Sequence, residues 1–271
     1  MGGGMSETEK LQKVLARAGM GSRRQMEHWI RDGRIRVNGR IARLGERVAP
    51  RMQITVDGRP LRRRSLSGLP RMLLYHKPVG VVTTRSDPAG RPTVFQHLPR
   101  IKKGRWIAVG RLDINTCGLL LFTTDGELAN RLMHPSFRLV REYAVRVYGE
   151  VTAEMITRLQ QGVELEDGRG AFDRIEVLCE AQAANGWYRV SLAEGRRREV
   201  RRLWESQGVR VSRLIRLRYG PVRLPPGLRQ GQIRKLGPAE IVRLCRAVDL
   251  DPAWPKQQAC TRRLSEALKN E

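Results

Sequence analysis

The sequence predicts an α+β fold in two parts, a small unit over residues 9–67 and a larger unit over residues 71–250. Strand-like segments dominate the larger part, and helices come between them without the strict alternation of a parallel doubly wound sheet. The smaller part opens with helical spacing and continues into a hairpin signal. A short basic stretch, Arg62–Gly68, reads as a linker, and residues 251–271 read as a polar, loosely held tail.

The small unit is predicted from helix and turn signals. Leu11, Val14 and Leu15 lie at helical spacing. Ser22 with Gln25 three residues later forms a capping box that begins a second helix. Asn38-Gly39 is the strongest two-residue hairpin signal, so we expect paired strands on either side of it.

The larger unit is predicted to begin with the strand Met72–Lys77. Asp125 caps a helix that His134-Pro135 ends. Further strands are predicted around Tyr143–Val147, Trp187–Leu192 and Val209–Tyr219, and further helices at Thr152–Gln161, Arg196–Gln207 and Glu240–Val248.

The charge of the chain points to a polyanionic partner. The 271 residues include 52 Lys and Arg against 27 Asp and Glu, a formal net charge of +25. Such an excess, carried mostly by arginine, favours nucleic acid. The four cysteines and four histidines show no metal-ligand spacing, and no nucleotide-binding motif appears, so we expect neither a metal nor a cofactor. No apolar run approaches the length of a membrane span, so we expect no membrane partner.

One carboxylate stands out in this basic chain. Asp113 lies in the run Gly110-Arg-Leu-Asp-Ile-Asn-Thr-Cys-Gly-Leu-Leu-Leu-Phe-Thr-Thr-Asp-Gly126, just before a strongly apolar strand. The pattern closely resembles the catalytic signature of the ribosomal RNA pseudouridine synthases. The resemblance implies a catalytic domain with a mixed, mainly antiparallel sheet, a reaction without cofactor, and Asp113 as its catalytic residue. Taken alone, Gly-Arg-Leu-Asp would also suit an ordinary turn or capping aspartate.

Further motifs of that family follow in order. Lys77-Pro78 with Gly80 resembles its first motif. Tyr143 matches a tyrosine that packs on the target base, and Arg201 matches the basic partner of the aspartate. Arg111 is placed to enter the base stack where the uridine leaves, a role borrowed from related enzymes. The alternatives, on local sequence, are a core tyrosine for Tyr143 and a solvated charge on a basic helix for Arg201.

A second resemblance concerns the small unit. Its two helices followed by Gly33-Arg-x-x-Val-Asn-Gly39 resemble the αL RNA-binding domain first named for a small-subunit ribosomal protein. Ser22, Arg23 and Arg24 would open the helix that faces RNA, since a helix N-terminus offers free N–H groups to phosphates. The alternative is a solvated helix start with two surface arginines. The RNA-binding set that we predict also includes Arg34, Arg36, Lys77, Arg196, Arg197 and Arg198.

The resemblance therefore predicts a cytoplasmic, monomeric enzyme that isomerises a specific uridine to pseudouridine in large-subunit (23S) ribosomal RNA, by base flipping and an ionised aspartate. Two alternatives stay open. One is a non-catalytic RNA-binding factor of ribosome assembly. The other is the same reaction on small-subunit ribosomal RNA or transfer RNA. The partner that we expect is ribosomal RNA, either as free large-subunit RNA or within a ribosomal precursor particle.

Overall fold

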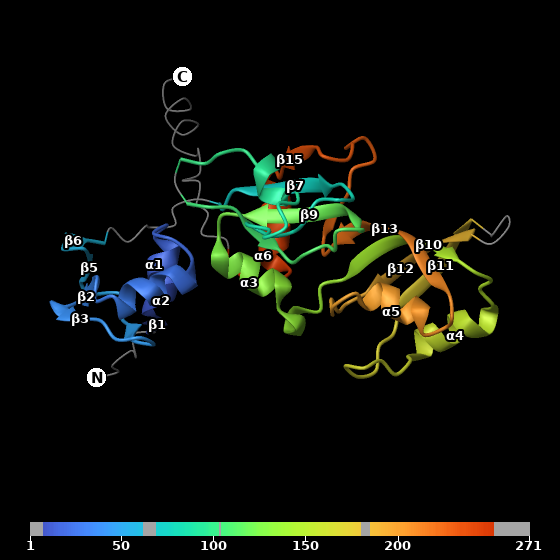
Figure 1. The fold of residues 1–271 in the computed structure, drawn as a ribbon, viewed down its shortest axis with the longest axis horizontal. Coiled ribbons are helices and arrows are strands. Elements are labelled where there is room, and N and C mark those ends of the chain that lie inside the picture. Colours follow the sequence, from blue (N-terminus) through green and yellow to red (C-terminus); the bar gives the residue numbers. More distant parts are fainter. Residues whose placement is uncertain (1–7, 62–68, 103, 180–184, 252–271) are drawn as a thin grey trace, which may run out of the picture. The chain divides into compact units, whose positions relative to one another are not determined.

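The computed structural model describes residues 8–61, 69–102, 104–179 and 185–251, and it divides into two compact units (Figure 1). The smaller unit comprises Met1–Ser67 with Arg100–Arg105, and the larger comprises Gly68–Pro99 with Trp106–Glu271. The predicted linker and all but the first residue of the predicted tail lie outside the described residues.

The smaller unit packs two helices and short strands around one apolar core. Its elements are β1 (Glu9–Lys10), α1 (Leu11–Arg17), α2 (Arg23–Arg31), β2 (Ile35–Val37), β3 (Arg40–Ile41), β4 (Arg47–Val48), β5 (Ile54–Val56) and β6 (Arg59–Pro60). Strands pair in the order β3-β2-β5-β6, and β1 pairs with β4. Leu11, Leu15, Met26 and Ile30 are buried between the helices and strands, as their helical spacing predicts.

Two local signals in this unit are confirmed. The Ser22 hydroxyl accepts a hydrogen bond from the Gln25 N–H at 3.0 Å, so Ser22 is the N-cap of α2. Asn38 and Gly39 have φ angles of 48° and 82°, the left-handed pair that a type I′ hairpin turn requires, and they join β2 to β3.

The larger unit is built on a mixed sheet, which confirms the α+β prediction. Its described strands run in the order β11-β12-β10-β13-β9-β7-β15, with β14 beside β13 and β8 beside β9. Among these strands only β9 and β13 pair in parallel. The strands are β7 (Met72–Lys77), β8 (Ile107–Val109), β9 (Cys117–Thr123), β10 (Arg141–Tyr148), β11 (Arg174–Cys179), β12 (Asn185–Leu192), β13 (Arg210–Tyr219), β14 (Val222–Arg223) and β15 (Ile233–Lys235).

Helices cover this sheet over two separate apolar clusters. Helices α3 (Gly126–Met133) and α6 (Pro238–Arg246) pack on β7, β8 and β9, and α4 (Ala153–Gln161) and α5 (Glu199–Glu205) pack on β10, β12 and β13 (Figure 1). Two short 3-10 turns, η1 (Val94–His97) and η2 (Pro135–Phe137), complete the elements. The Asp125 carboxylate accepts hydrogen bonds from the Glu127 and Leu128 N–H groups, which confirms it as the cap of α3.

The two halves of the sheet join where β9 meets β13. Gly118 is paired with Arg216, and its φ is +109°, a conformation that favours glycine. A Cβ at Gly118 would lie 2.5 Å from the main-chain nitrogen of Arg216 and closer still to its carbonyl oxygen. Only glycine therefore permits this close approach, which brings the segment before β9 beside β13.

The start of α5 differs from the prediction. A helix was predicted from Arg196, but α5 begins at Glu199, and its N-cap Arg198 has a left-handed φ of 50°. Arg196–Arg198 form a turn instead, because the Arg196 side chain is held by groups distant in sequence.

Candidate active site

Asp113 lies in the turn that connects β8 to β9. Gly110 enters the turn with φ +77°, and the Thr116 N–H donates to the Asp113 carbonyl at 3.1 Å. Leu112 is buried beneath the turn, Asp113 is half-exposed, and Ile114 is exposed. The apolar neighbour thus anchors the turn while the carboxylate remains accessible.

A second turn, at Lys77-Pro78-Val79-Gly80, supports the first. The Gly80 N–H donates to the Ile114 carbonyl at 2.8 Å. The Lys77 ammonium donates to the carbonyls of Pro78 at 2.9 Å and Thr116 at 2.8 Å. One buried cation therefore holds both turns by their main chains.

This position corrects the prediction that Lys77 contacts RNA. Its side chain is fully buried, so its ammonium is not available at the surface. Burial lowers the pKa of Lys77 to about 8, although the nearby Cys117 and Asp113 oppose that shift. The lysine of this motif therefore acts inside the fold.

Arg201 contacts the same turn from α5. Its guanidinium donates to the carbonyl of Asn115 at 3.0 Å and to that of Val211 at 2.8 Å. The side chain is only 4% exposed. Burial lowers the pKa of Arg201, and Asp113 counteracts this. Within the described residues Arg201 forms no ion pair with Asp113, so it influences the carboxylate through space and through the Asn115 main chain.

Tyr143 lies at the same level of the sheet. In the strand register Tyr143 is paired with Arg216, and Arg216 with Gly118. Two strand spacings, about 10 Å, therefore separate Tyr143 from β9. Tyr143 is 8% exposed, and its ring packs in the apolar cluster under α5. Tyr143 is therefore both a core residue and a neighbour of the strands that carry the site. Arg111, next to Leu112, is exposed.

Arg216 is a buried cation that the sequence interpretation missed. Its Nε donates to the Leu119 carbonyl at 2.7 Å, and its guanidinium lies 5.1 Å from the Tyr219 ring centre. It helps to lower the pKa of Lys77. Strand β13 carries arginines on both faces, so no local signal distinguishes the buried one from the exposed ones.

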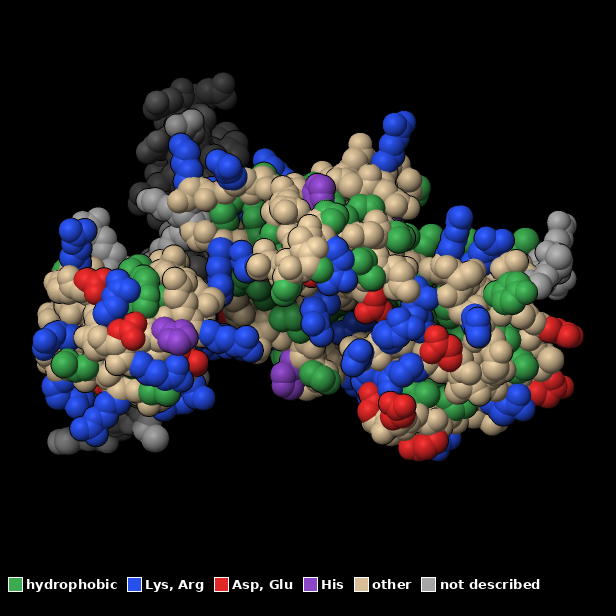
Figure 2. Space-filling view, viewed as in Figure 1, with side chains coloured by type: hydrophobic (Ala, Val, Ile, Leu, Met, Phe, Trp, Pro, Cys, Tyr) green, Lys and Arg blue, Asp and Glu red, His purple; other side chains and the backbone are tan. Residues whose placement is uncertain are grey.

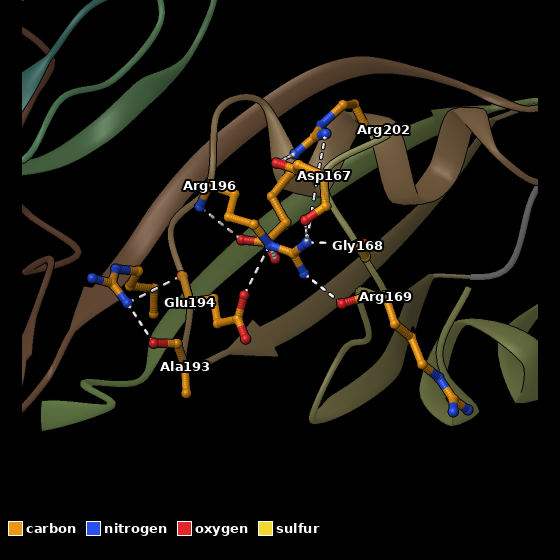
Figure 3. A network of polar contacts seen from close by, with 9 residues as sticks. Asp167, Gly168, Arg169, Ala193, Glu194, Arg196 and Arg202 are labelled. Atoms are coloured by element: carbon orange, nitrogen blue, oxygen red, sulfur yellow. Dashed lines mark hydrogen bonds and ion pairs between the residues drawn. The ribbon is translucent and has the colours of Figure 1, made fainter. Parts of the chain in front are cut away.

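Arg196 is bound by several protein groups, and its side chain stays 20% exposed. Its guanidinium is surrounded by protein acceptors (Figure 3), so RNA would have to compete with these contacts, and RNA binding by Arg196 stays a prediction. Nε binds Glu199 at 3.0 Å and Glu194 at 2.9 Å, while the terminal nitrogens bind the Asp167 carboxylate and the carbonyls of Gly168 and Arg169. Arg202 binds the same Asp167 carboxylate at 2.8 and 2.9 Å. These contacts tie the loop at residues 167–169 to the start of α5, the helix that carries Arg201.

The other arginines of this run are more accessible. Arg197 is exposed, and Arg198 is partly exposed, 3.5 Å from the Glu205 carboxylate. Figure 2 shows Lys and Arg side chains gathered over the α5 side of the sheet. Arg197 and Arg198 therefore remain predicted RNA contacts.

The smaller unit presents its own basic residues. Arg23 and Arg24 are exposed at the start of α2, next to the Ser22 cap. Arg34 binds the Asp57 carboxylate at 2.9 and 2.6 Å and stacks 4.1 Å from the Trp29 ring centre, so RNA would have to compete with that ion pair. Arg36 is exposed and donates to the Gly39 carbonyl at 2.9 Å.

A search of the described residues finds no group of three or more His, Cys, Asp or Glu side chains that could hold a metal ion. It also finds no helix there that is long and apolar enough to span a membrane.

The chain thus combines a small unit that exposes arginines at the start of α2 with a larger unit whose sheet carries the Asp113 turn, the two parts that the resemblance to RNA-modifying enzymes predicts. Comparison with known families agrees: residues 71–206 match the RNA pseudouridylate synthase model, and residues 9–54 match the S4 domain. The chain belongs to the RNA pseudouridylate synthase family and carries an S4 domain at its N-terminal side.

Individual relatives are similar along most of the chain. A Pseudomonas aeruginosa protein named ribosomal large subunit pseudouridine synthase B is 59% identical over 90% of this chain, which covers 64% of that protein. The Escherichia coli protein of the same name is 56% identical, with 90% of this chain and 85% of that protein covered. A crystal structure described as a pseudouridylate synthase has the same fold, with a TM-score of 0.60 at 24% identity, covering 87% of this chain and 99% of that one.

Proposed function

We propose that this protein isomerises a specific uridine to pseudouridine in large-subunit ribosomal RNA, with Asp113 as the catalytic carboxylate. The observation that carries the proposal is the Asp113 turn, which is half-exposed and whose main-chain carbonyls accept hydrogen bonds from the side chains of Lys77 and Arg201. The names of relatives 56–59% identical to this chain support the choice of RNA.

The reaction needs few groups. The bond between ribose C1′ and uracil N1 breaks, the base turns, and C1′ bonds to C5. The proton on C5 leaves and N1 gains one, so atoms and charge balance without an oxidant or cofactor. Asp113 supplies the carboxylate for these steps, and it lies half-exposed in its turn.

The neighbouring residues receive supporting roles in this proposal. Arg201 keeps the Asp113 turn in place and adds positive charge beside the carboxylate. Tyr143 packs against the target base, for which a flat ring with a polar tip is suited. Arg111 enters the vacancy left by the flipped uridine, offsetting part of the few kcal/mol that unstacking costs.

The small unit would hold the RNA through phosphate contacts. Arg23 and Arg24 at the N-terminus of α2 combine two charges with free helix N–H groups. We propose that the protein acts as a monomer in the cytoplasm.

Mapping of carbodiimide adducts by primer extension tests the proposal. Large-subunit RNA incubated with the wild type should acquire one new stop, which identifies the target nucleotide. The Asp113→Asn variant should produce none, while Asp173→Asn, which removes an exposed carboxylate directly before β11, should behave as wild type. A stop on small-subunit RNA alone would reassign the substrate, and no stop on any RNA would favour a binding factor of ribosome assembly.

A further inference from the structure

Two apolar side chains stand exposed on the turns beside Asp113. Val79 is 57% exposed and Ile114 is 37% exposed. Ile114 directly follows Asp113, and Val79 precedes Gly80, whose N–H binds the Ile114 carbonyl at 2.8 Å. Single exposed apolar residues are common, but a pair placed together at a catalytic turn requires an explanation.

Both turns are fixed from beneath. The buried Lys77 ammonium bonds one carbonyl in each turn, Pro78 at 2.9 Å and Thr116 at 2.8 Å. The Thr83 hydroxyl donates to the Leu112 carbonyl at 2.8 Å, on the other side of Asp113. The rigid main chain therefore keeps the side chains of Val79 and Ile114 projecting into solvent, and they cannot fold back into the core.

The side chains themselves are stiff. Valine and isoleucine are branched at Cβ and have restricted χ1 angles, so contact with a partner immobilises little side-chain freedom. Rigid apolar groups on a rigid turn are suited to pressing against a flat surface. Proteins that disturb base stacking insert side chains of this kind between bases.

The arginines near the pair favour RNA as its partner. Arg111 is exposed two residues before Asp113, and Arg213 is exposed on β13. An apolar pair with arginines nearby matches RNA, whose bases offer apolar faces between negatively charged phosphates. A protein partner with an apolar patch would not account for this surrounding positive charge.

We propose that Val79 and Ile114 form an apolar wedge that contacts the nucleobase next to the target uridine and keeps it from re-stacking on that uridine. The proposal deepens the proposed function and rests on it. The wedge acts on the base that stays in the strand, whereas Arg111 is assigned to the vacancy itself.

Replacing both residues by threonine keeps branching at Cβ but makes the surface polar. The Val79→Thr/Ile114→Thr variant is compared with Val177→Thr/Leu178→Thr, a matched pair 47% and 41% exposed on β11. Both variants should melt as the wild type does. On an RNA fragment that the wild type isomerises, the wedge variant should lose about 10-fold in kcat/KM, and the β11 control should lose none.

Abasic substitution then identifies the contact. Each neighbour of the target uridine is replaced in turn by an abasic nucleotide. At the contacted neighbour no base remains to re-stack, so the kcat/KM of the wedge variant should rise to within twofold of that of the wild type on the same RNA, whereas at the other neighbour it should stay about 10-fold lower. The wedge is refuted if its variant stays within twofold of the β11 control on the unmodified RNA, or if the difference between wild type and variant is the same at both abasic positions. Absence of wild-type isomerisation on the RNA would instead overturn the proposed function, and the wedge with it.

Discussion

Gly118 allows the close approach of β9 and β13, and its replacement by alanine should be unusually costly. The residue has φ +109°, where a side chain adds about 1–3 kcal/mol of strain. An added Cβ would also lie 2.5 Å from the Arg216 nitrogen, and relieving such an overlap costs about 1–3 kcal/mol or more. Because the obstructing atoms are backbone, the strands must move apart.

We therefore expect Gly118→Ala to reduce the free energy of unfolding of the larger unit by about 4 kcal/mol, a large part of typical domain stability. For a unit of this size the melting temperature should fall by about 10 °C. Gly208→Ala is the matched control. Gly208 also has a left-handed φ, +79°, but open space where its Cβ would lie, so only about 1–2 kcal/mol of strain is expected.

Far-UV circular dichroism during urea and thermal unfolding measures both variants. The close approach is refuted as the cause if Gly118→Ala is no less stable than Gly208→Ala. A surviving Gly118→Ala protein should also isomerise more slowly, because Asp113 lies in the turn that leads into this part of β9.

Three other predictions concern charged groups. Arg23→Ala with Arg24→Ala should weaken RNA binding and reduce the slope of affinity against salt by about two units; an unchanged slope would contradict phosphate contacts. Arg201→Lys replaces the two separate nitrogens that bind the Asn115 and Val211 carbonyls by a single ammonium, so kcat should fall by about 100-fold while RNA affinity holds, and an unchanged kcat would contradict its positioning role. The pKa of Lys77 is lowered from 10.5 to about 8, so between pH 8 and 10.5 the unfolded chain binds more protons than the folded chain. The contribution of Lys77 to the free energy of unfolding should therefore rise with pH over this range, by up to about 3 kcal/mol. Urea titrations from pH 7 to 10.5 should show this rise in the wild type relative to Lys77→Met, and parallel curves would contradict it.

Local signals in the sequence predicted local structure well. Ser22, Asp125 and Asn38-Gly39 act within three or four residues, and each is confirmed as a cap or turn. The interactions that decide these elements are contained in the short segment that carries the signal.

The sequence predictions are wrong where residues distant in the sequence determine the local structure. Arg196 looks like the first turn of a basic helix, but Asp167 and the carbonyls of the following loop bind its guanidinium and shift the helix start to Glu199. Lys77 looks like a surface charge in a binding motif, yet the Thr116 carbonyl holds it inside the fold. The spacing of residues along the sequence does not indicate either of these contacts.

The assembly of the site also depends on long-range pairing. Gly118 and Arg216 lie about a hundred residues apart in the sequence, and their parallel register is what brings Arg201 and Asp113 into one neighbourhood. The motifs predicted which residues belong to the site, whereas the sheet order that unites them became visible only in the structure.

Tritium release tests the central claim most directly, because formation of the C1′–C5 bond displaces the hydrogen on C5. Large-subunit ribosomal RNA carrying tritium at uridine C5 is incubated with the wild type and with Asp113→Asn, and RNA affinity is measured alongside. The wild type should release tritium up to one equivalent per RNA, and Asp113→Asn should release none above the blank while binding within about twofold. Release by the asparagine variant within tenfold of the wild type, or none by the wild type, would contradict catalysis of uridine isomerisation by Asp113.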